Sequence, residues 1–108
     1  WNSNFNDGDL NVTLKNALES GKKFMFRYLA FDKKFTATYT VKTTIGGITI
    51  VDTGNAGTVE LTEEQAKAGY TITTTVTIAA GGYWQISFYG NTAGETVTIS
   101  NIVITPIA

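Results

Sequence analysis

The side chains best suited to ligand binding lie in one stretch near the C-terminus, residues 83–89. Its odd-numbered positions alternate aromatic rings with hydrogen-bonding groups: Tyr83, Gln85, Ser87 and Tyr89. In a strand these side chains share one face, because successive side chains point to opposite faces. Sugars are complementary to such a face, since their C–H surfaces stack on aromatic rings and their hydroxyls hydrogen-bond to amides. The pattern predicts carbohydrate contacts at Tyr83, Gln85 and Tyr89; the alternative is that the tyrosines flank a sheet edge.

A second, partly apolar face lies earlier in the chain, at Met25, Arg27, Leu29 and Phe31. If this segment and residues 83–89 are neighbours in one sheet, the two faces form a single shallow platform. We therefore expect Arg27 and Phe31 to add contacts to the same site. Trp1 has two interpretations: a ring at the rim that stacks on a sugar, or an anchor that pins the terminus to the core.

Catalysis is disfavoured by the residues that are missing. The chain has no histidine and no cysteine, so it lacks the commonest general base and any thiol nucleophile. A glycosidase needs two facing carboxylates, one with a raised pKa. The acidic residues here fall mostly in expected turns, as at Asp52, or on an expected short helix, and none stands mid-strand beside a hydrophobic cluster. We expect no catalytic residues and no enzyme activity.

Oxygen-bearing side chains near the N-terminus loosely resemble a calcium loop: Asn2, Asn4, Asn6, Asp7 and Asp9. Their spacing does not match the EF-hand pattern, and only two of them are charged. An Asn/Asp-rich turn is the simpler interpretation. We therefore expect no metal ligands and no cofactor, with a structural calcium ion as the alternative.

The basic residues are unevenly distributed. The net charge is −1, which argues against nucleic acid as a partner. Seven of the eight basic residues nevertheless fall in one part of the chain: Lys15, Lys22, Lys23, Arg27, Lys33, Lys34 and Lys42. This clustering allows a patch for an acidic polysaccharide, or lysines that keep turns and edges soluble. Spanning a bilayer takes about 20 consecutive apolar residues, and no apolar run here approaches that length, so no membrane partner is expected.

Alternation of apolar and polar residues dominates the chain and predicts about eight strands. They cover residues 10–15, 22–31, 35–42, 48–50, 58–61, 70–78, 83–89 and 95–104. A capping box at Thr62–Gln65 predicts one short helix, and residues 16–20 are compatible with a helical turn. A parity switch near Asn101 predicts a bulge. The expected fold is a single domain, residues 1–108: an all-β, two-sheet antiparallel β-sandwich with jelly-roll topology.

The order of these segments resembles the jelly-roll carbohydrate-binding modules of bacterial plant-cell-wall hydrolases. The resemblance comprises a threonine-rich strand from Tyr70, the aromatic strand 83–89, a Gly90-x-x-x-Gly94 turn and a closing strand with Asn101 before Ile-x-Ile. The Gly-Lys-x-aromatic start of the strand at residues 21–26 is also similar. The opening strand of the family is shortened or missing here.

The resemblance implies a secreted, non-catalytic, monomeric module attached to a glycoside hydrolase or another enzyme. Its ligand would be a plant cell-wall polysaccharide of the β-glucan, mannan, xylan or xyloglucan type. Two alternatives remain. One is an acidic polysaccharide bound by the lysine cluster and Arg27; the other is a structural or adhesive spacer in a surface protein, favoured by the all-threonine outer face of residues 71–77.

Overall fold

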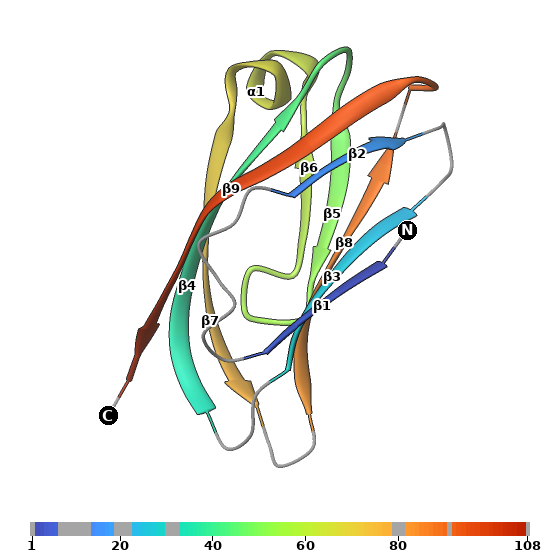
Figure 1. Ribbon diagram of the computed structural model, residues 1–108. Helices are drawn as coiled ribbons and strands as arrows, with labels where there is room; N and C mark the ends of the chain where they lie inside the picture. The colour runs from blue at the N-terminus through green and yellow to red at the C-terminus, as the bar shows by residue number, and fades with distance from the viewer. Residues whose placement is uncertain are drawn as a thin grey trace.

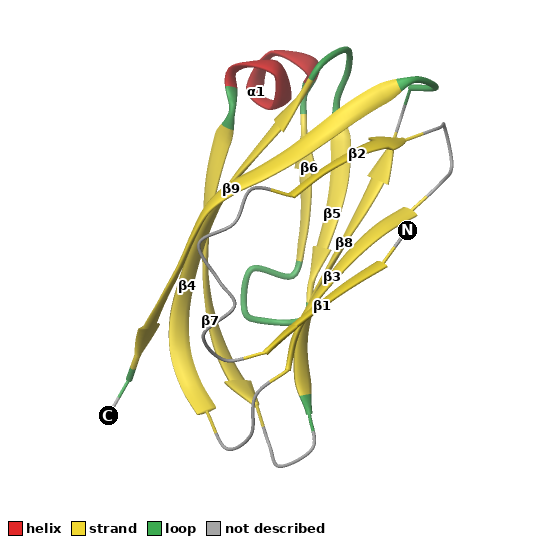
Figure 2. Cartoon of the chain, in the orientation of Figure 1, coloured by secondary structure: helices red, strands yellow, loops and turns green. Residues whose placement is uncertain are grey.

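The computed structural model describes residues 2–6, 14–18, 23–29, 33–78, 82–90 and 92–107, and these form two facing β-sheets (Figures 1 and 2). One sheet has five strands, in the spatial order β1 (Asn2–Asn6), β3 (Lys23–Leu29), β8 (Tyr83–Gly90), β5 (Ile48–Asp52) and β6 (Thr58–Leu61). The other has four, in the order β2 (Leu14–Leu18), β9 (Glu95–Pro106), β4 (Lys33–Thr43) and β7 (Tyr70–Ile78). The predicted all-β sandwich is confirmed.

Strands far apart in the sequence pair in a nested order. β2 pairs with β9, β3 with β8, β4 with β7 and β5 with β6, all antiparallel. Among the described strands the one parallel pair is β1 with β3, at the edge of the five-stranded sheet. The nesting places β8 between β3 and β5, so the aromatic strand lies inside its sheet with a neighbour on each side.

The core lies between the sheets and takes alternate residues from the strands whose side chains the structure describes, β3 to β9. Trp84, Ile86 and Phe88 are all buried, as their shared parity predicts. The Trp84 ring contacts both sheets, with its centroid 5.5 Å from that of Phe26 and 5.8 Å from that of Phe35. Fully burying one such side chain stabilises a fold by roughly 1.5–3 kcal/mol. The inward direction of the even-numbered β8 side chains therefore fixes the odd-numbered ones on the outer face.

The N-terminal segments differ from the sequence-based expectation. Residues 16–18, expected in a helical turn, belong to strand β2, and Asn16 lies opposite Val97 of β9. A lone helical turn fixes several residues for one hydrogen bond, whereas pairing along β9 satisfies the backbone continuously. The first strand of the structure is β1, which has five residues and precedes the first strand expected from the sequence.

The predicted bulge in the last strand is confirmed. Asn101 has φ of 54°, and the pairing of β9 with β4 shifts register between Thr38 and Thr40. The shift lets Ile99 and Ile102 both point into the core despite their opposite parity. Left-handed backbone is tolerated by asparagine far better than by β-branched residues.

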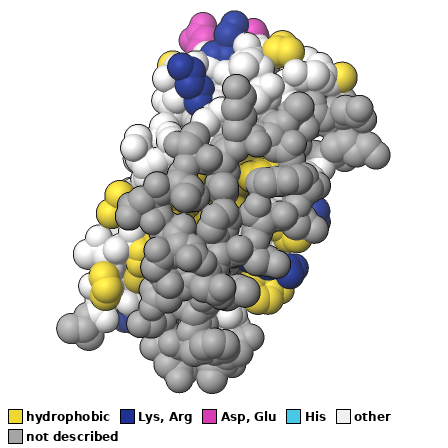
Figure 3. All heavy atoms as spheres, viewed as in Figure 1, with side chains coloured by type: hydrophobic (Ala, Val, Ile, Leu, Met, Phe, Trp, Pro, Cys, Tyr) yellow, Lys and Arg dark blue, Asp and Glu magenta, His cyan; other side chains and the backbone are white. Residues whose placement is uncertain are grey.

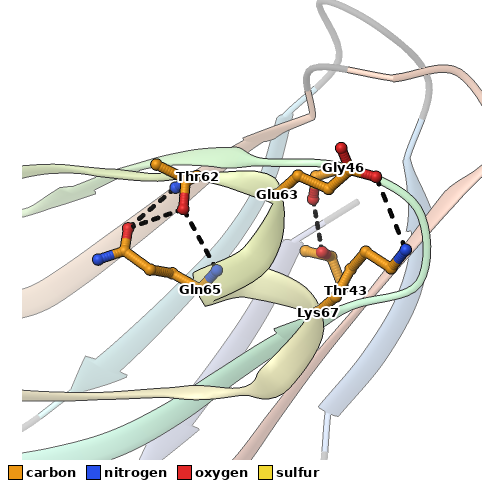
Figure 4. A network of polar contacts seen from close by, with 6 residues as sticks. All are labelled: Thr43, Gly46, Thr62, Glu63, Gln65 and Lys67. Carbon is orange, nitrogen blue, oxygen red and sulfur yellow. Dashed lines mark hydrogen bonds and ion pairs between the residues drawn. The ribbon is translucent and has the colours of Figure 1, made fainter.

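The short helix is also where the capping box places it. Helix α1 (Glu63–Ala68) begins after Thr62, whose Oγ1 accepts from the Gln65 N–H at 3.3 Å, while Gln65 Oε1 accepts from the Thr62 N–H at 3.0 Å (Figure 4). Glu63 and Lys67 add an ion pair of 3.6 Å, one turn apart. Among the described residues no helix is long and apolar enough to cross a membrane.

Candidate functional site

Strand β8 presents two tyrosine rings on the outer face of the five-stranded sheet. Tyr83 is 45% exposed and Tyr89 is 37% exposed, whereas Trp84 between them is fully buried. At about 3.3 Å per residue the two tyrosines stand about 20 Å apart along the strand. The odd-numbered rings therefore point to solvent, as the alternation predicts, and mark the two ends of one long surface.

Arg27 lies beside this strand because β3 and β8 are neighbours, with Arg27 directly opposite Gln85. Its Nε donates to Gln85 Oε1 at 2.8 Å, and Gln85 Nε2 donates to Ser87 Oγ at 3.1 Å. The hydrogen bond from Nε sets the orientation of the amide, because only the oxygen of the amide accepts. Arg27 and Gln85, which the sequence places 58 residues apart, thus form one fixed polar pair.

The guanidinium of Arg27 also lies over the ring of Tyr83, with Cζ 4.5 Å from the ring centroid. This cation–π contact covers one face of the Tyr83 ring. Tyr83 can therefore offer a ligand its other face and its hydroxyl, but not both faces. The contact also holds the guanidinium in place, so Arg27 meets a ligand with little freedom left to lose.

At the centre of this surface, the side chain of Ser87 is less exposed than the sequence pattern indicates. Ser87 is buried, at 3% exposure, between Met25 of β3 and Val51 of β5, which flank it in register. Ser87 therefore holds the Gln85 amide through its hydrogen bond, and it is too buried to contact a ligand. Tyr89 has Lys23 on one side and Thr49 on the other. We define the platform by its outward side chains: Lys23, Met25, Arg27, Thr49, Val51, Tyr83, Gln85 and Tyr89.

Two of the expected contacts, Trp1 and Phe31, lie outside the described residues, as do Asp7 and Asp9 of the possible calcium turn. Within the described part of the chain, no group of three His, Cys, Asp or Glu side chains could hold a metal ion.

The described members of the basic cluster do not share one surface. Lys23 and Arg27 are on the platform, opposite Tyr89 and Gln85. Lys34 and Lys42 are exposed on β4, opposite Thr77 and Thr98 on the outer face of the four-stranded sheet. The two sheets pack through their inner faces, so these two pairs of cations point in opposite directions.

One acidic residue contradicts the expectation that no carboxylate stands beside a hydrophobic cluster. Asp52 is only 3% exposed. Its oxygens accept from Tyr39 Oη at 2.7 Å, Trp84 Nε1 at 3.0 Å, the Gly54 N–H at 2.6 Å and Thr74 Oγ1 at 3.3 Å. Burial, with the nearby Asp52 charge and hydrogen bond, raises the pKa of the Tyr39 hydroxyl far above its ordinary value.

The sequence after Val51 is typical of a turn, so it does not indicate that Asp52 is buried. The alternation that buries Ile48 and Ile50 includes Asp52 as its next position, and this signal could have predicted its burial. A carboxylate held by four donors has a structural role, because its lone pairs are already occupied. A side chain at Gly54 would collide with Thr74 Oγ1, so the turn depends on glycine there. Glu95, at the start of β9, is a second buried acid that the sequence did not reveal.

The Asp52 cluster also positions the platform. Directly after it, the Thr53 N–H donates to the Gln85 carbonyl and Thr53 Oγ1 accepts from the Gln85 N–H, both at 3.0 Å. Both backbone groups of Gln85 are therefore bonded to residue 53, while Arg27 of β3 lies opposite Gln85 on its other side. Two successive residues, Asp52 and Thr53, thus connect the buried cluster to the half-buried Gln85.

No protein-family model, no curated protein and no solved structure matches this chain. The class that the fold defines is an all-β sandwich with an aromatic and polar platform on one outer face.

Proposed function

We propose that this chain is a non-catalytic domain that binds polysaccharide on the platform. The observation that carries the proposal is the exposure of Tyr83 and Tyr89 at the two ends of β8, with the fixed Arg27–Gln85 pair beside the first of them. A sugar chain lying along β8 would stack on the ring of Tyr89. It would receive hydrogen bonds from Arg27 and Gln85 farther along.

The nested strand pairing supports a finer proposal. Pairing β2 with β9, β3 with β8, β4 with β7 and β5 with β6 is what winding a jelly roll produces. We therefore keep the resemblance to carbohydrate-binding modules of plant-cell-wall hydrolases as a proposal. Under this proposal, the chain is a secreted module attached to such an enzyme and binds β-glucan, mannan, xylan or xyloglucan. An open surface buries little of each sugar, so we expect weak binding, with Kd in the micromolar to millimolar range.

Affinity gels containing xyloglucan, glucomannan, xylan or pectin test the proposal. We expect at least one polymer to retard the protein and Tyr89→Ala to abolish the retardation, because the variant removes the stacking ring. Tyr70→Ala is the matched control, since Tyr70 is 39% exposed but lies on β7 of the other sheet. Both variants should keep the melting temperature of the parent protein within about 3 °C, as expected for exposed positions.

Two results would oppose the proposal: no retardation by any polymer, or equal loss of retardation in the Tyr70 and Tyr89 variants. The second would locate binding away from the platform or expose a general defect.

A structural or adhesive spacer is the second candidate, and the outer face of the four-stranded sheet favours it. There β4 and β7 place threonine opposite threonine in three successive pairs, and the hydroxyls of Thr40 and Thr71 lie 3.1 Å apart. Such a row of paired threonines, with Lys34 and Lys42 at its ends, suits solvent or a neighbouring domain. A protein that folds normally but binds no glycan would favour this function over the first.

A further inference from the structure

Among the described side chains, hydrogen-bond donors outnumber acceptors at the Arg27 end of the platform. Arginine has five N–H donors and no acceptor. Among the described residues its one hydrogen-bond partner is Gln85, through Nε, which leaves the two terminal nitrogens as an open fork. The same bond occupies the amide oxygen of Gln85, while Gln85 Nε2 donates one of its two hydrogens to Ser87 Oγ. A ligand group here meets mainly donors, and it must itself be rich in acceptors.

The local charge points the same way. On the platform side of the sheet, the described acid is Glu60, which pairs with Thr49 in the row of Tyr89 and lies three strands from Lys23. From strand spacings of about 4.8 Å and a rise of about 3.3 Å per residue, Glu60 lies about 19 Å from Arg27. The Debye length at physiological salt is about 8 Å, so Glu60 does not neutralise Arg27. Lys23, about 13 Å away along β3 and opposite Tyr89, is also beyond one Debye length and places its positive charge at the other end of the platform.

The exposed acids of α1 lie at the other end of the molecule from the start of β8. Figure 3 shows one side of the molecule, and the acidic side chains visible there gather at the end where α1 lies. Strand β8 begins at the opposite end of the molecule (Figure 1). Asp52 is near in sequence to Thr53, but its carboxylate is inside the core and is shared by four donors. The guanidinium therefore faces the ligand side with its charge unpaired by any described acid.

We infer that Arg27 forms a subsite for a carboxylate group, and that the platform prefers cell-wall polysaccharides with uronic acid residues, such as glucuronoxylan, over neutral β-glucan, mannan or xyloglucan. This inference rests on the proposed function and names its ligand class. The two terminal nitrogens of Arg27 match the two oxygens of a carboxylate, which makes a bidentate, charge-assisted contact. The stacked Tyr83 ring and the Gln85 oxygen hold the fork in position before the ligand arrives. The neighbouring sugars of the chain continue along β8 toward Tyr89.

The test compares each acidic polymer with its own uncharged form. Polygalacturonate, alginate and glucuronoxylan are each presented as the free acid and after full methyl esterification, in affinity gels at low salt. For at least one polymer we expect the free acid to bind about tenfold more tightly than the ester, which corresponds to one good ionic contact. Raising the salt to about 0.5 M should weaken the acid form and leave the ester nearly unchanged.

Variants assign the contact to Arg27. Arg27→Gln should abolish the preference for the free acid, and Arg27→Lys should keep part of it, because lysine retains the charge but not the planar fork. Lys42→Gln is the matched control: it removes one exposed cation on β4, outside the platform, and should change affinity less than twofold. Melting curves of all variants check that each is folded.

The outcomes separate the inference from the proposal beneath it. Equal binding of acid and ester that depends on Tyr89 would overturn the carboxylate subsite and leave polysaccharide binding in place. A preference for the acid that survives in Arg27→Gln would overturn the assignment to Arg27. Absence of binding to every polymer, neutral ones included, would overturn both.

Discussion

At the scale of single residues, Asp52 joins the two sheets. Its donors come from β4, β7, β8 and the turn that follows β5, so one carboxylate is shared by both layers. A buried ionised group is costly unless its hydrogen bonds are made, and here Tyr39, Thr74 and Trp84 supply them. The cluster therefore links the two sheets by specific hydrogen bonds within a mainly apolar core.

The raised pKa of the Tyr39 hydroxyl predicts a loss of stability in alkali. Up to about pH 10 both states keep the Tyr39 proton, but above it the unfolded chain releases the proton while the folded protein holds it. The free energy of unfolding should then fall by about 1.4 kcal/mol per pH unit from this residue alone. Urea unfolding between pH 9 and 11 measures the slope.

Tyr39→Phe is the comparison for that experiment. The variant should be less stable at neutral pH by about 1–3 kcal/mol, because Asp52 loses a donor, and its slope above pH 10 should be shallower by about 1.4 kcal/mol per unit. Identical slopes in the two proteins would mean that Tyr39 does not retain its proton in the folded state.

At the scale of the elements, strands could be predicted where one face is buried and the other is not. The threonine alternation of β7 and the aromatic alternation of β8 are examples. The site was predictable only in part, since Tyr83 and Tyr89 follow from parity, but the Arg27–Gln85 contact depends on which strands are neighbours. The same non-local pairing made β2 a strand although its local sequence allowed a helical turn. Asp52 was missed because its neighbours have turn-like composition while its own position follows strand parity.

The bulge in β9 gives a prediction at this scale. Asn101 is exposed and has φ of 54°, so Asn101→Gly should change the free energy of unfolding by less than about 0.5 kcal/mol, whereas Asn101→Val should cost about 1–2 kcal/mol. Thr98→Val, on the same strand in regular pairing, is the control and should be nearly neutral. Urea unfolding gives all three values; an Asn101→Val variant as stable as the parent would show that the bulge can move.

At the scale of the whole molecule, one core holds both sheets together. A single cluster of buried residues takes side chains from both, and the radius of gyration is 13.3 Å, close to the about 13 Å of a compact domain of this length. The molecule is elongated, at 39 × 22 × 22 Å, and its long axis leaves room for the two-ended platform.

This continuity predicts that both layers unfold together. Thermal unfolding followed by tryptophan fluorescence and by far-ultraviolet circular dichroism should give coincident transitions, because Trp84 contacts both sheets. Two separated transitions would show that one sheet can persist without the other.

The turn after Asp52 has a consequence for how copies of the chain behave when crowded. β7 is an edge strand without charged residues or proline, the kind of strand that invites pairing with a second chain. Asn55 occupies both backbone groups of Thr75, donating its N–H to the carbonyl and accepting from the N–H through its side chain. A strand of a second copy therefore finds this edge interrupted at Thr75, which limits edge-to-edge pairing along β7 when copies are crowded.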